Sequence, residues 1–516
     1  LENFGSCLTN TIFSKSKPNV KLTILKLLEK ENLVKPSSIS RAIVSFLKFD
    51  LNIEKLLKNL NVNISLNNLH DLIVELNQNK ILTKFMTMSV FPDLEFEKIF
   101  TKLRSVILEQ IDELRSYKDI LNFQSILATH CYLNEYIFNE TIKENDKVKK
   151  LEKTISLSYK KNIHPDFSSI LCLASFRPIH IYSWSKLILF PDEFVNLKKL
   201  LIDDYDYEKH IQKSIDVFNK ISNNISNKVK NQYEENPYPR WKNLRTFRDP
   251  LTIFEFCKDI NLKIENEKIY NITNPKILIA GCGTGQQSIT AASLYKNCEI
   301  LAIDLSFKSL SYAKRKTQEL DFKNINYMQA DILNTPNLNE KFDIIECTGV
   351  IHHMEDPIRG WKSLVKSLKP GGLIKIGLYS KLARKEISKT RDEISKLHKI
   401  SEVSDMKKFR KKLINSKFHH HKKLTESQDF YSMSNFRDLL FHVQEYHFTL
   451  PEIKKCLSNL GLKFCGFEID HYLTSEFNKT YHERDFSYDL DKWADFESCY
   501  NYSFIGMYQF WCQKIV

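Results

Sequence analysis

The feature that most constrains this chain is a run of glycines that directly follows an apolar segment. Three of the 12 glycines lie at positions 281, 283 and 285, and the residues before them are Lys276-Ile277-Leu278-Ile279-Ala280. An apolar run of this length is typical of a buried strand, and glycine tolerates the positive φ of a tight turn. We therefore expect a strand, a turn and a helix, with backbone that approaches a ligand closely.

Strands and helices are expected to alternate from residue 276 onward. The predicted strands are 276–280, 299–303, 325–329, 342–347, 373–379, 463–469 and a last one near 503–513, and the predicted helices are 286–296, 308–320, 358–368 and 450–460. Such alternation predicts an α/β fold with a mostly parallel sheet and helices on both faces.

The first part of the chain has a different pattern. Residues 1 to about 225 contain one glycine, Gly5, and apolar residues at helical spacing. We predict an all-helical domain at 1–225, interpreted as the remnant or the cap of a helical-repeat array, followed by an α/β domain at 226–516. A charged stretch at 381–448 interrupts the alternation and predicts a helical insertion on the substrate side of the sheet.

Composition narrows the function classes. The 76 Lys and Arg against 63 Asp and Glu give a net charge of +13, which leaves nucleic acid open as a partner. The 11 cysteines include no CxxC pair, which favours a reducing, cytoplasmic location. No apolar run is long enough to span a membrane. The chain starts at Leu1, so we expect that it lacks an N-terminal part.

The glycine spacing decides between two kinds of nucleotide site. A dinucleotide-binding motif has glycines at its first, third and sixth positions, but here the sixth position is Gln286. The GxGxG pattern suits a smaller ligand without a pyrophosphate. Asp304 follows the next strand and would accept hydrogen bonds from ribose hydroxyls, and Asp331 follows the third strand, where an adenine amino group would be its partner.

Taken together, these motifs resemble those of the class I S-adenosylmethionine-dependent methyltransferases, which have a seven-stranded, Rossmann-like, mostly parallel sheet. The resemblance rests on GCGTG, Asp304, Ala330-Asp331, the FDIIE strand with its histidine pair, and KPGG. It implies S-adenosyl-L-methionine as cofactor. Gly281, Gly283 and Gly285 would contact its methionine part, Asp304 the ribose, and Asp331 with Ile332 the adenine. Further contacts are implied for Cys282, Thr284, Gln286, Leu305, Ala330, Thr348 and Gly349.

One position departs from the family pattern. The family often carries an acidic residue two positions before the first glycine, where this chain has Ile279. The ammonium group of the cofactor would then need another partner.

A narrower resemblance covers residues 80 to 516. ILIAGCGTGQ, GVIHHMEDPIRGW, KPGGLIKIGLYSKLAR and the upstream YEENPYPRW look like a bacterial group in which the methyltransferase domain follows tetratricopeptide repeats. This resemblance implies that repeats stood before Leu1, and we expect the helical domain to recruit a protein partner or to cap such repeats.

The candidate catalytic residues are His352 and His353, because a neutral imidazole accepts a proton near pH 7. The alternative is that they orient the loop. Tyr233, Tyr238, Arg240 and Trp241 are expected to form a lid or an aromatic wall, with a packed linker as the alternative. Candidates for substrate specificity lie in the insertion: Arg384, Arg391, Tyr431, Arg437, His442 and Glu445.

No metal site is predicted. Consecutive histidines, such as His419-His420-His421, do not converge on one ion from a helix, and we expect them on a solvated basic face. Cys282 and Cys347 are expected to pack as small apolar residues.

The sequence therefore predicts a cytoplasmic methyltransferase whose acceptor, a small molecule or a protein, is unidentified. Two alternatives remain open at this point. One is an interaction module that binds the cofactor without turnover, and the other is an RNA methyltransferase.

Overall fold

The computed structural model describes residues 1–15, 17–30, 33–58, 65–114, 117–397, 400 and 402–515. The chain divides into two compact units. Unit 1 comprises Leu1–Tyr207, Arg240–Arg245 and Ile394–Leu439, and unit 2 comprises Glu208–Pro239, Thr246–Glu393 and Leu440–Val516. The predicted boundary near residue 225 thus lies inside unit 2, and the predicted insertion at 381–448 is shared between the two units.

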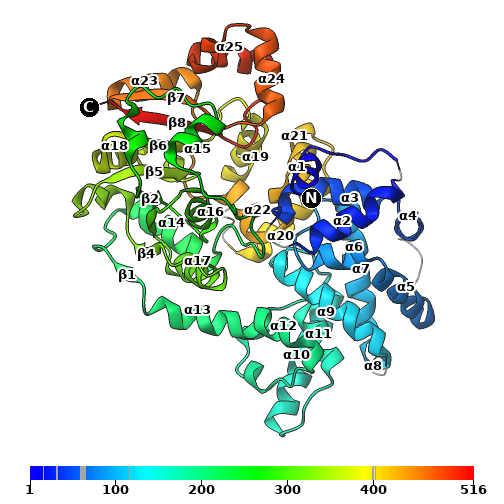
Figure 1. Cartoon of the computed structure of the whole chain (residues 1–516). Coiled ribbons are helices and arrows are strands. Elements are labelled where there is room, and N and C mark those ends of the chain that lie inside the picture. The colour runs from blue at the N-terminus through cyan, green and yellow to red at the C-terminus, as the bar shows by residue number, and fades with distance from the viewer. Residues whose placement is uncertain are drawn as a thin grey trace. The chain divides into compact units, whose positions relative to one another are not determined.

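Among its described residues, unit 1 consists of helices joined by turns and loops, without a strand (Figure 1). Its first helices carry the apolar stripes that the sequence predicts, and three later helices come from the predicted insertion. The helices are α1 (Glu2–Thr9), α2 (Lys21–Leu28), α3 (Ser40–Leu47), α4 (Leu51–Lys58), α5 (Leu66–Gln78), α6 (Lys80–Met86), α7 (Leu94–Glu109), α8 (Ile111–Leu114), α9 (Lys118–Leu133), α10 (Ile142–Lys160), α11 (Phe167–Ala174), α12 (Val195–Lys198), α20 (Val403–Ile414), α21 (His419–Thr425) and α22 (Met433–Phe441).

A buried ion pair joins the predicted insertion to the helical part of the chain. Arg410 of α20 donates from both terminal nitrogens to the carboxylate of Glu97 on α7, at 2.7 and 2.6 Å. Its Nε donates to the carbonyl of Phe430 at 2.8 Å. Both charged side chains are buried. Residues 394–439 therefore belong to the core of unit 1 through contacts 313 positions apart in sequence.

Unit 2 is built on one mixed sheet with the strand order β1-β4-β3-β2-β5-β6-β8-β7. All neighbours from β1 to β6 are parallel, and β8 is antiparallel to both β6 and β7. The strands are β1 (Asp216–Val217), β2 (Lys276–Ala280), β3 (Glu299–Asp304), β4 (Ile325–Gln329), β5 (Phe342–Thr348), β6 (Leu368–Leu378), β7 (Leu462–Phe467) and β8 (Tyr508–Lys514).

The predicted α/β fold is confirmed, with one correction. The seven predicted strands are present, but the sheet has an eighth, the two-residue edge strand β1, which pairs with β4. Its segment, Asp216–Val217, is exposed and carries no alternating apolar pattern, so periodicity could not reveal it.

Helices cover both faces of this sheet (Figure 1). One face packs in a large apolar cluster with α18, α23 and α25, and the other lies against α15, α16 and α17. The helices of unit 2 are α13 (Asp204–Gln212, mostly), α14 (Asn224–Glu235), α15 (Ile253–Asp259), α16 (Gln286–Leu294), α17 (Phe307–Glu319), α18 (Pro357–Ser367), α19 (Lys385–Ser395, mostly), α23 (Leu450–Leu460), α24 (His471–Thr480) and α25 (Leu490–Cys499).

Capping residues explain where several of these helices begin. Ser306 and Asp356 accept hydrogen bonds from backbone N–H groups in the first turns of α17 and α18. Thr449 and Glu452 form a reciprocal capping box on α23, which ends at Gly461 in the left-handed conformation. Local capping residues therefore determine where these three helices begin.

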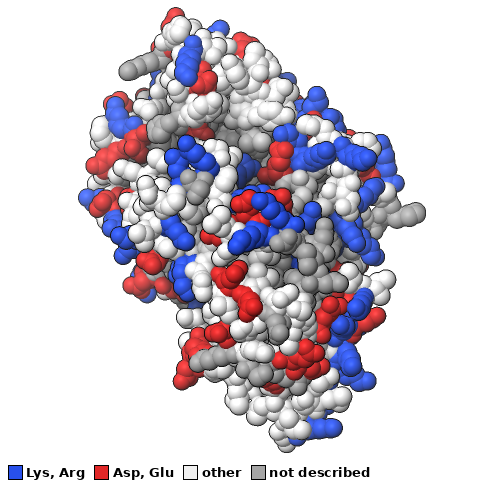
Figure 2. Space-filling model, turned by 90° about the vertical axis from the view of Figure 1, so that its right-hand side faces the viewer, with Lys and Arg blue, Asp and Glu red and all other residues white. Residues whose placement is uncertain are grey.

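The surface charge and the character of the helices are relevant to nucleic acid and membranes as partners. On the face drawn in Figure 2, basic and acidic side chains are interspersed, so the net charge of +13 does not gather there in one basic patch. In the described part of the chain, no helix combines the length and the apolar character that crossing a membrane requires.

Candidate functional site

The predicted cofactor residues lie in four loops at one edge of the sheet. The loops follow β2, β3, β4 and β5, which are neighbours in the order β4-β3-β2-β5 and run parallel. Because the carboxyl ends of parallel strands meet at the same edge, the loops converge there. They hold residues 281–285, 304–305, 330–332 and 348–349.

The glycine loop admits no side chain at its three glycines. Gly281, Gly283 and Gly285 all have positive φ, at 76°, 51° and 87°. A Cβ at these positions would come within 2.5 Å of Val350, 2.7 Å of the Tyr238 carbonyl oxygen and 2.7 Å of the Ala313 Cβ, respectively. Glycine is therefore required at these positions, both because the backbone has a positive φ and because neighbouring atoms leave no space for a side chain. Gly285 is also the N-cap residue of α16.

Asp304 is fixed against this loop. Its Oδ2 accepts the N–H of Gly283 at 2.9 Å, and its Oδ1 accepts the N–H of Ser306 at 2.9 Å. Burial raises the pKa of the Asp304 carboxyl, and the hydrogen bonds from backbone N–H groups oppose this rise. Each carboxylate oxygen has a second lone pair, so the group retains the capacity to accept from two hydroxyls.

The other two loops present a buried acid and a glycine. Asp331 is buried and accepts the N–H of Leu333 at 2.9 Å, and its neighbours Ala330 and Ile332 are buried as well. Gly349 has a φ of +78° directly after Thr348, the last residue of β5. Leu305 directly follows β3, and Gln286 is the first residue of α16.

The segment Asn236-Pro237-Tyr238-Pro239, here called the strap, contacts the glycine loop. The Tyr238 carbonyl lies over Gly283, and the Thr284 hydroxyl donates to the Pro239 carbonyl. Glu234, at the end of α14, accepts the N–H of Phe307 at 2.5 Å. These contacts hold the strap at the edge of the sheet where the four loops converge.

The predicted lid residues divide between the two units. Tyr233 and Tyr238 belong to unit 2, and their rings stack with centroids 6.3 Å apart. Arg240 and Trp241 belong to unit 1, where Arg240 lies 3.4 Å from Glu135 and over the ring of Tyr132. Only the two tyrosines lie in the same unit as the glycine loop.

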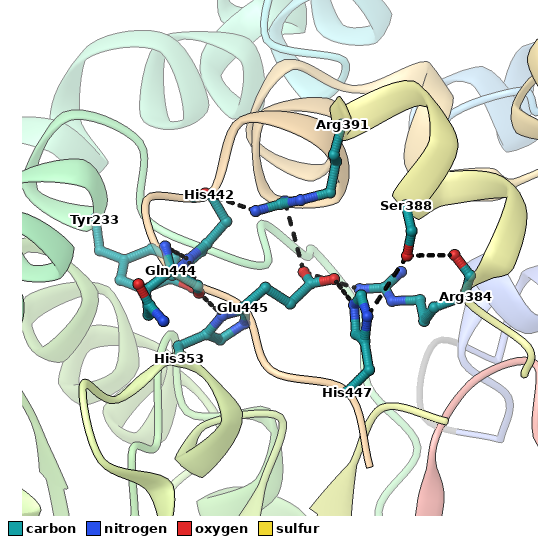
Figure 3. A network of polar contacts seen from close by, with 9 residues as sticks. All are labelled: Tyr233, His353, Arg384, Ser388, Arg391, His442, Gln444, Glu445 and His447. Carbon is teal, nitrogen blue, oxygen red and sulfur yellow. Dashed lines mark hydrogen bonds and ion pairs between the residues drawn. The ribbon is translucent and has the colours of Figure 1, made fainter. Parts of the chain in front are cut away.

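A second polar cluster lies in unit 2, around Gln444 and Glu445 (Figure 3). Four of the predicted specificity residues, Arg384, Arg391, His442 and Glu445, meet in it, together with the predicted catalytic residue His353. The other two, Tyr431 and Arg437, lie in unit 1. The Tyr431 hydroxyl donates there to the Thr425 carbonyl at 2.7 Å.

Hydrogen bonds set the tautomers of two histidines in this cluster. The Nδ1 atoms of His353 and His442 each lie 2.7 Å from the Gln444 carbonyl oxygen, and the two rings stack with centroids 3.6 Å apart. A carbonyl oxygen only accepts, so each Nδ1 carries the hydrogen and each Nε2 of the neutral ring is an acceptor. The Nε2 of His442 accepts from the Tyr233 hydroxyl at 3.2 Å.

Both rings are neutral near pH 7. Burial lowers the pKa of His353 well below its usual range, and the neighbouring His442 lowers it further. Burial and the guanidinium of Arg391 lower the pKa of His442 to about 3. The Nε2 of His353 is therefore a proton acceptor at neutral pH.

His352 has a different environment. Its ring is buried, stacks on Tyr379 with centroids 4.0 Å apart, and has no hydrogen-bond partner at either nitrogen among the described residues. Burial, followed by the neighbouring His353, lowers its pKa well below the usual range. The predicted histidine pair thus consists of one residue with a defined acceptor nitrogen and one that is buried against aromatic rings without a hydrogen bond among the described residues.

Glu445 is the acidic centre of the cluster. It is buried, lies 3.3 Å from Arg384 and 3.7 Å from Arg391, and contacts the Nε2 of His447 at 2.6 Å. Burial disfavours its charged form, but the contact with His447 and the two guanidinium groups lower its pKa to about 2. A carboxylate held in this way fixes both arginines, and Arg391 also donates to the His442 carbonyl at 2.8 Å.

The buried neutral histidines predict a loss of stability in acid. The pKa of His352 lies below that of an unfolded histidine, about 6.5, so the unfolded chain binds the extra proton and stability falls as pH drops through that value. We expect His352→Phe, which removes no hydrogen bond, to raise stability relative to the wild type by about 2 kcal/mol at pH 5 and by little at pH 7.

Urea unfolding at the two pH values measures this difference. An equal effect of the substitution at pH 5 and pH 7 would contradict the prediction.

The expected surroundings of the two cysteines and of the three consecutive histidines can be compared with the structure. Cys282 and Cys347 are buried, and burial raises the pKa of both thiols, which fits their expected role as packed residues. The expectation for His419-His420-His421 was wrong in part, because His421 is buried and its Nδ1 lies 2.8 Å from the Ser416 hydroxyl.

Sequence reasoning missed several members of these networks. Gln287 and Glu346 contact each other beneath the glycine loop, and Gln444, His447 and Ser388 belong to the cluster in Figure 3. One signal was available for Glu346, since a single acidic residue in the last part of an apolar strand is rarely buried without a partner.

Known proteins resemble part of this chain. Residues 273–438 match a family model described as a methyltransferase domain. An uncharacterized protein of Synechococcus is 30% identical over 201 residues, which are 37% of this chain and 48% of that protein. The release factor glutamine methyltransferase of Flavobacterium psychrophilum is 41% identical over 81 residues, 16% of this chain and 28% of that enzyme. The chain therefore spans about half of these relatives or less.

Two solved structures are also similar. PKMT2 from Rickettsia typhi in complex with AdoHcy is 17% identical, with a TM-score of 0.38 over 54% of this chain and 55% of that chain. Magnesium protoporphyrin IX methyltransferase from Synechocystis with bound SAM is 14% identical, with a TM-score of 0.29 over 57% of this chain and 100% of that chain.

Proposed function

We propose that this chain, whose residues 273–438 match a family model described as a methyltransferase domain, is a class I S-adenosylmethionine-dependent methyltransferase that transfers a methyl group to an acceptor, which gives up a proton to His353. The observation that carries the proposal is the convergence of the glycine loop, Asp304 and Asp331 at one sheet edge. This edge is where ligands of parallel α/β folds bind.

The residues of the four loops fit the cofactor that the domain requires. The positive φ values and close neighbours of Gly281, Gly283 and Gly285 require glycine in this loop, and we assign the loop to the methionine part of the cofactor. Asp304 has the acceptor capacity for the ribose hydroxyls, and the buried Asp331 has it for the adenine amino group. We assign contacts to Cys282, Thr284, Gln286, Leu305, Ala330, Ile332, Thr348 and Gly349 on the same loops.

The bound cofactor supplies an electrophilic methyl group on its sulfonium. The chain's own contribution is to place the acceptor in line with that group and to remove the acceptor's proton. We assign the proton removal to the Nε2 of His353, since the Gln444 carbonyl holds the hydrogen on Nδ1 and burial keeps the ring neutral. His442, with its stacked ring, and Glu445, through both arginines, position this group.

Tyr233 and Tyr238 are proposed as the wall of the acceptor site. Tyr238 reaches the glycine loop through its carbonyl, and Tyr233 reaches the histidine cluster through its hydroxyl. These two tyrosines thus contact both the loop that would hold the cofactor and the cluster that would hold the acceptor, which supports a role in excluding water from the reaction.

The test uses the full chain and S-adenosylmethionine labelled on its methyl group. After incubation with cell extract, protein, nucleic acid and small molecules are separated and counted. We expect label in the protein or small-molecule fraction. Label in nucleic acid alone would assign the acceptor to RNA or DNA, and cofactor binding without label in any fraction would contradict an enzyme.

Replacement of His353 tests the proposed proton acceptor. We expect His353→Gln to lower kcat by about 10²-fold to 10⁴-fold, because general-base catalysis contributes about this much. Binding of S-adenosylhomocysteine is expected to stay unchanged, since the residue is assigned to the acceptor side.

His352→Phe is the matched comparison, and we expect it to retain most of the activity because its ring has no hydrogen bond to lose. If His352→Phe lost as much activity as His353→Gln, both histidines would act only by packing.

The proposal also covers the family subgroup, the protein partner and the location of the whole protein. We place it in the methyltransferase group that accompanies tetratricopeptide repeats, and we assign to unit 1 the recruitment of a protein partner. Side chains of Ile181, Leu187, Leu189 and Val195 in unit 1 are 54–66% exposed, which gives such a partner apolar surface to contact. The free cysteines are in keeping with the cytoplasm as its location.

A further inference from the structure

A buried carboxylate lies beside the position where the family often carries an acid. Ile279 of β2 is in register with Glu346 of the parallel neighbour β5. Residues in register on parallel strands have their side chains on the same face of the sheet. Glu346 is 5% exposed, and it lies two residues before Thr348 at the carboxyl end of its strand. Glu346 therefore places a carboxylate on the neighbouring strand, in register with Ile279 and on the same face of the sheet.

The contacts of Glu346 lead to the glycine loop. Its Oε2 accepts from the Nε2 of Gln287 at 2.8 Å, and its Oε1 accepts from the Tyr295 hydroxyl at 3.3 Å. Gln287 lies in the first turn of α16, two residues after Gly285. Its Nε2 also donates to the Thr348 hydroxyl at 3.3 Å. Gln287 thus bridges the buried acid and the loop after β5.

This bridge fixes the orientation of the Gln287 amide. An amide nitrogen has two hydrogens, and here Glu346 and Thr348 accept one each. The Gln287 Oε1 therefore points away from both of them and is an acceptor. Gln287 is half-buried in the first turn of α16, directly after the glycine loop, so this acceptor belongs to the segment that would border a ligand of the loop.

The charges favour a cationic donor. The Glu346 side chain accepts hydrogen bonds from two neutral groups, Gln287 and Tyr295. The nearby cation, Lys375, contacts Glu468 at 2.7 Å. Burial raises the pKa of Glu346, and the charge of Lys375 opposes the rise. A buried carboxylate without a cation in contact is costly, so a positive group nearby would be stabilised.

We infer that Gln287, oriented by the buried Glu346, accepts a hydrogen bond from the α-ammonium group at the methionine end of the cofactor. The inference rests on the proposed function, because it assigns a contact within the same site. It supplies the partner that Ile279 cannot provide. Gln287 is the contact residue, and Glu346 is a positioning residue that polarises and orients it.

Two ligands distinguish the contact with the α-ammonium group from the other contacts of the cofactor site. S-adenosylhomocysteine carries the α-ammonium group, whereas 5′-methylthioadenosine has the same adenosine and sulfur without the amino-acid end. We expect Gln287→Met and Glu346→Gln each to weaken S-adenosylhomocysteine binding by about tenfold or more, the effect of losing a hydrogen bond to a charged group. Binding of 5′-methylthioadenosine is expected to change less than about threefold.

Glu340→Gln is the control for the loss of a carboxylate. Glu340 pairs with Lys276 at 2.9 Å at the opposite end of the strands, and its substitution should leave both affinities unchanged. Equal losses for the two ligands, or no loss for S-adenosylhomocysteine, would overturn the inference. A wild-type chain that binds neither ligand would instead contradict the proposed function itself.

Discussion

Alanine at position 283 is expected to weaken binding of S-adenosylhomocysteine at least about 30-fold. Gly283 has a φ of +51°, which an alanine adopts only with strain. Its Cβ would also come within 2.7 Å of the Tyr238 carbonyl oxygen, a backbone atom that cannot rotate away. Either the loop or the strap must shift, and a shift of the loop breaks the hydrogen bond from the Gly283 N–H to Asp304.

Gly461→Ala separates the two causes of this effect. Gly461 ends α23 with a φ of +65°, and a Cβ there would meet nothing within 4 Å. Its substitution therefore carries the same kind of backbone strain without a collision and away from the site. Isothermal titration should find its affinity close to that of the wild type. If Gly283→Ala also bound normally, the strap would not press on the glycine loop.

The second large effect is expected in unit 1, from the ion pair of Arg410 and Glu97. We expect Arg410→Met to lower the free energy of unfolding by about 3–5 kcal/mol, because it leaves the carboxylate of Glu97 buried without its partner. The lost hydrogen bond to the Phe430 carbonyl and the contact of the guanidinium with the Phe430 ring add to the effect. Hydrogen exchange in α7 and α20 measures it locally.

Two further variants test whether the destabilisation comes from the buried charge that is left without a partner. The double variant Arg410→Met with Glu97→Met should be less destabilised than the sum of the single changes, since no buried charge remains. Lys408→Met, in the exposed pair of Lys408 and Asp405 on the same helix, should change stability by less than about 0.5 kcal/mol. Additive effects of Arg410→Met and Glu97→Met would show that the pair is not coupled.

Local patterns were sufficient to predict the sheet and the loops at its carboxyl edge. The apolar segment 276–280 and the positive-φ glycines after it are determined by neighbouring residues, and β2 has the predicted bounds. The same holds for β4, for α23 and for the acids that follow β3 and β4. In each case the signal lies within a few residues of the element that it predicts.

Long-range contacts could not be predicted in this way. The membership of residues 394–439 in unit 1 depends on partners such as Glu97, which is 313 positions from Arg410. The orientation of His353 depends on the carbonyl of Gln444, a backbone atom without any signature in the sequence. Glu346 was visible as an acid in an apolar strand, but its bridge to Gln287 joins residues 59 positions apart and has no local signature.

The most direct test of the central claim is a calorimetric titration of the full chain with S-adenosylhomocysteine. The account predicts saturable binding at one site per chain, displaced by S-adenosylmethionine and weakened by Gly283→Ala but not by Gly461→Ala. Absence of binding up to about 1 mM ligand would contradict it.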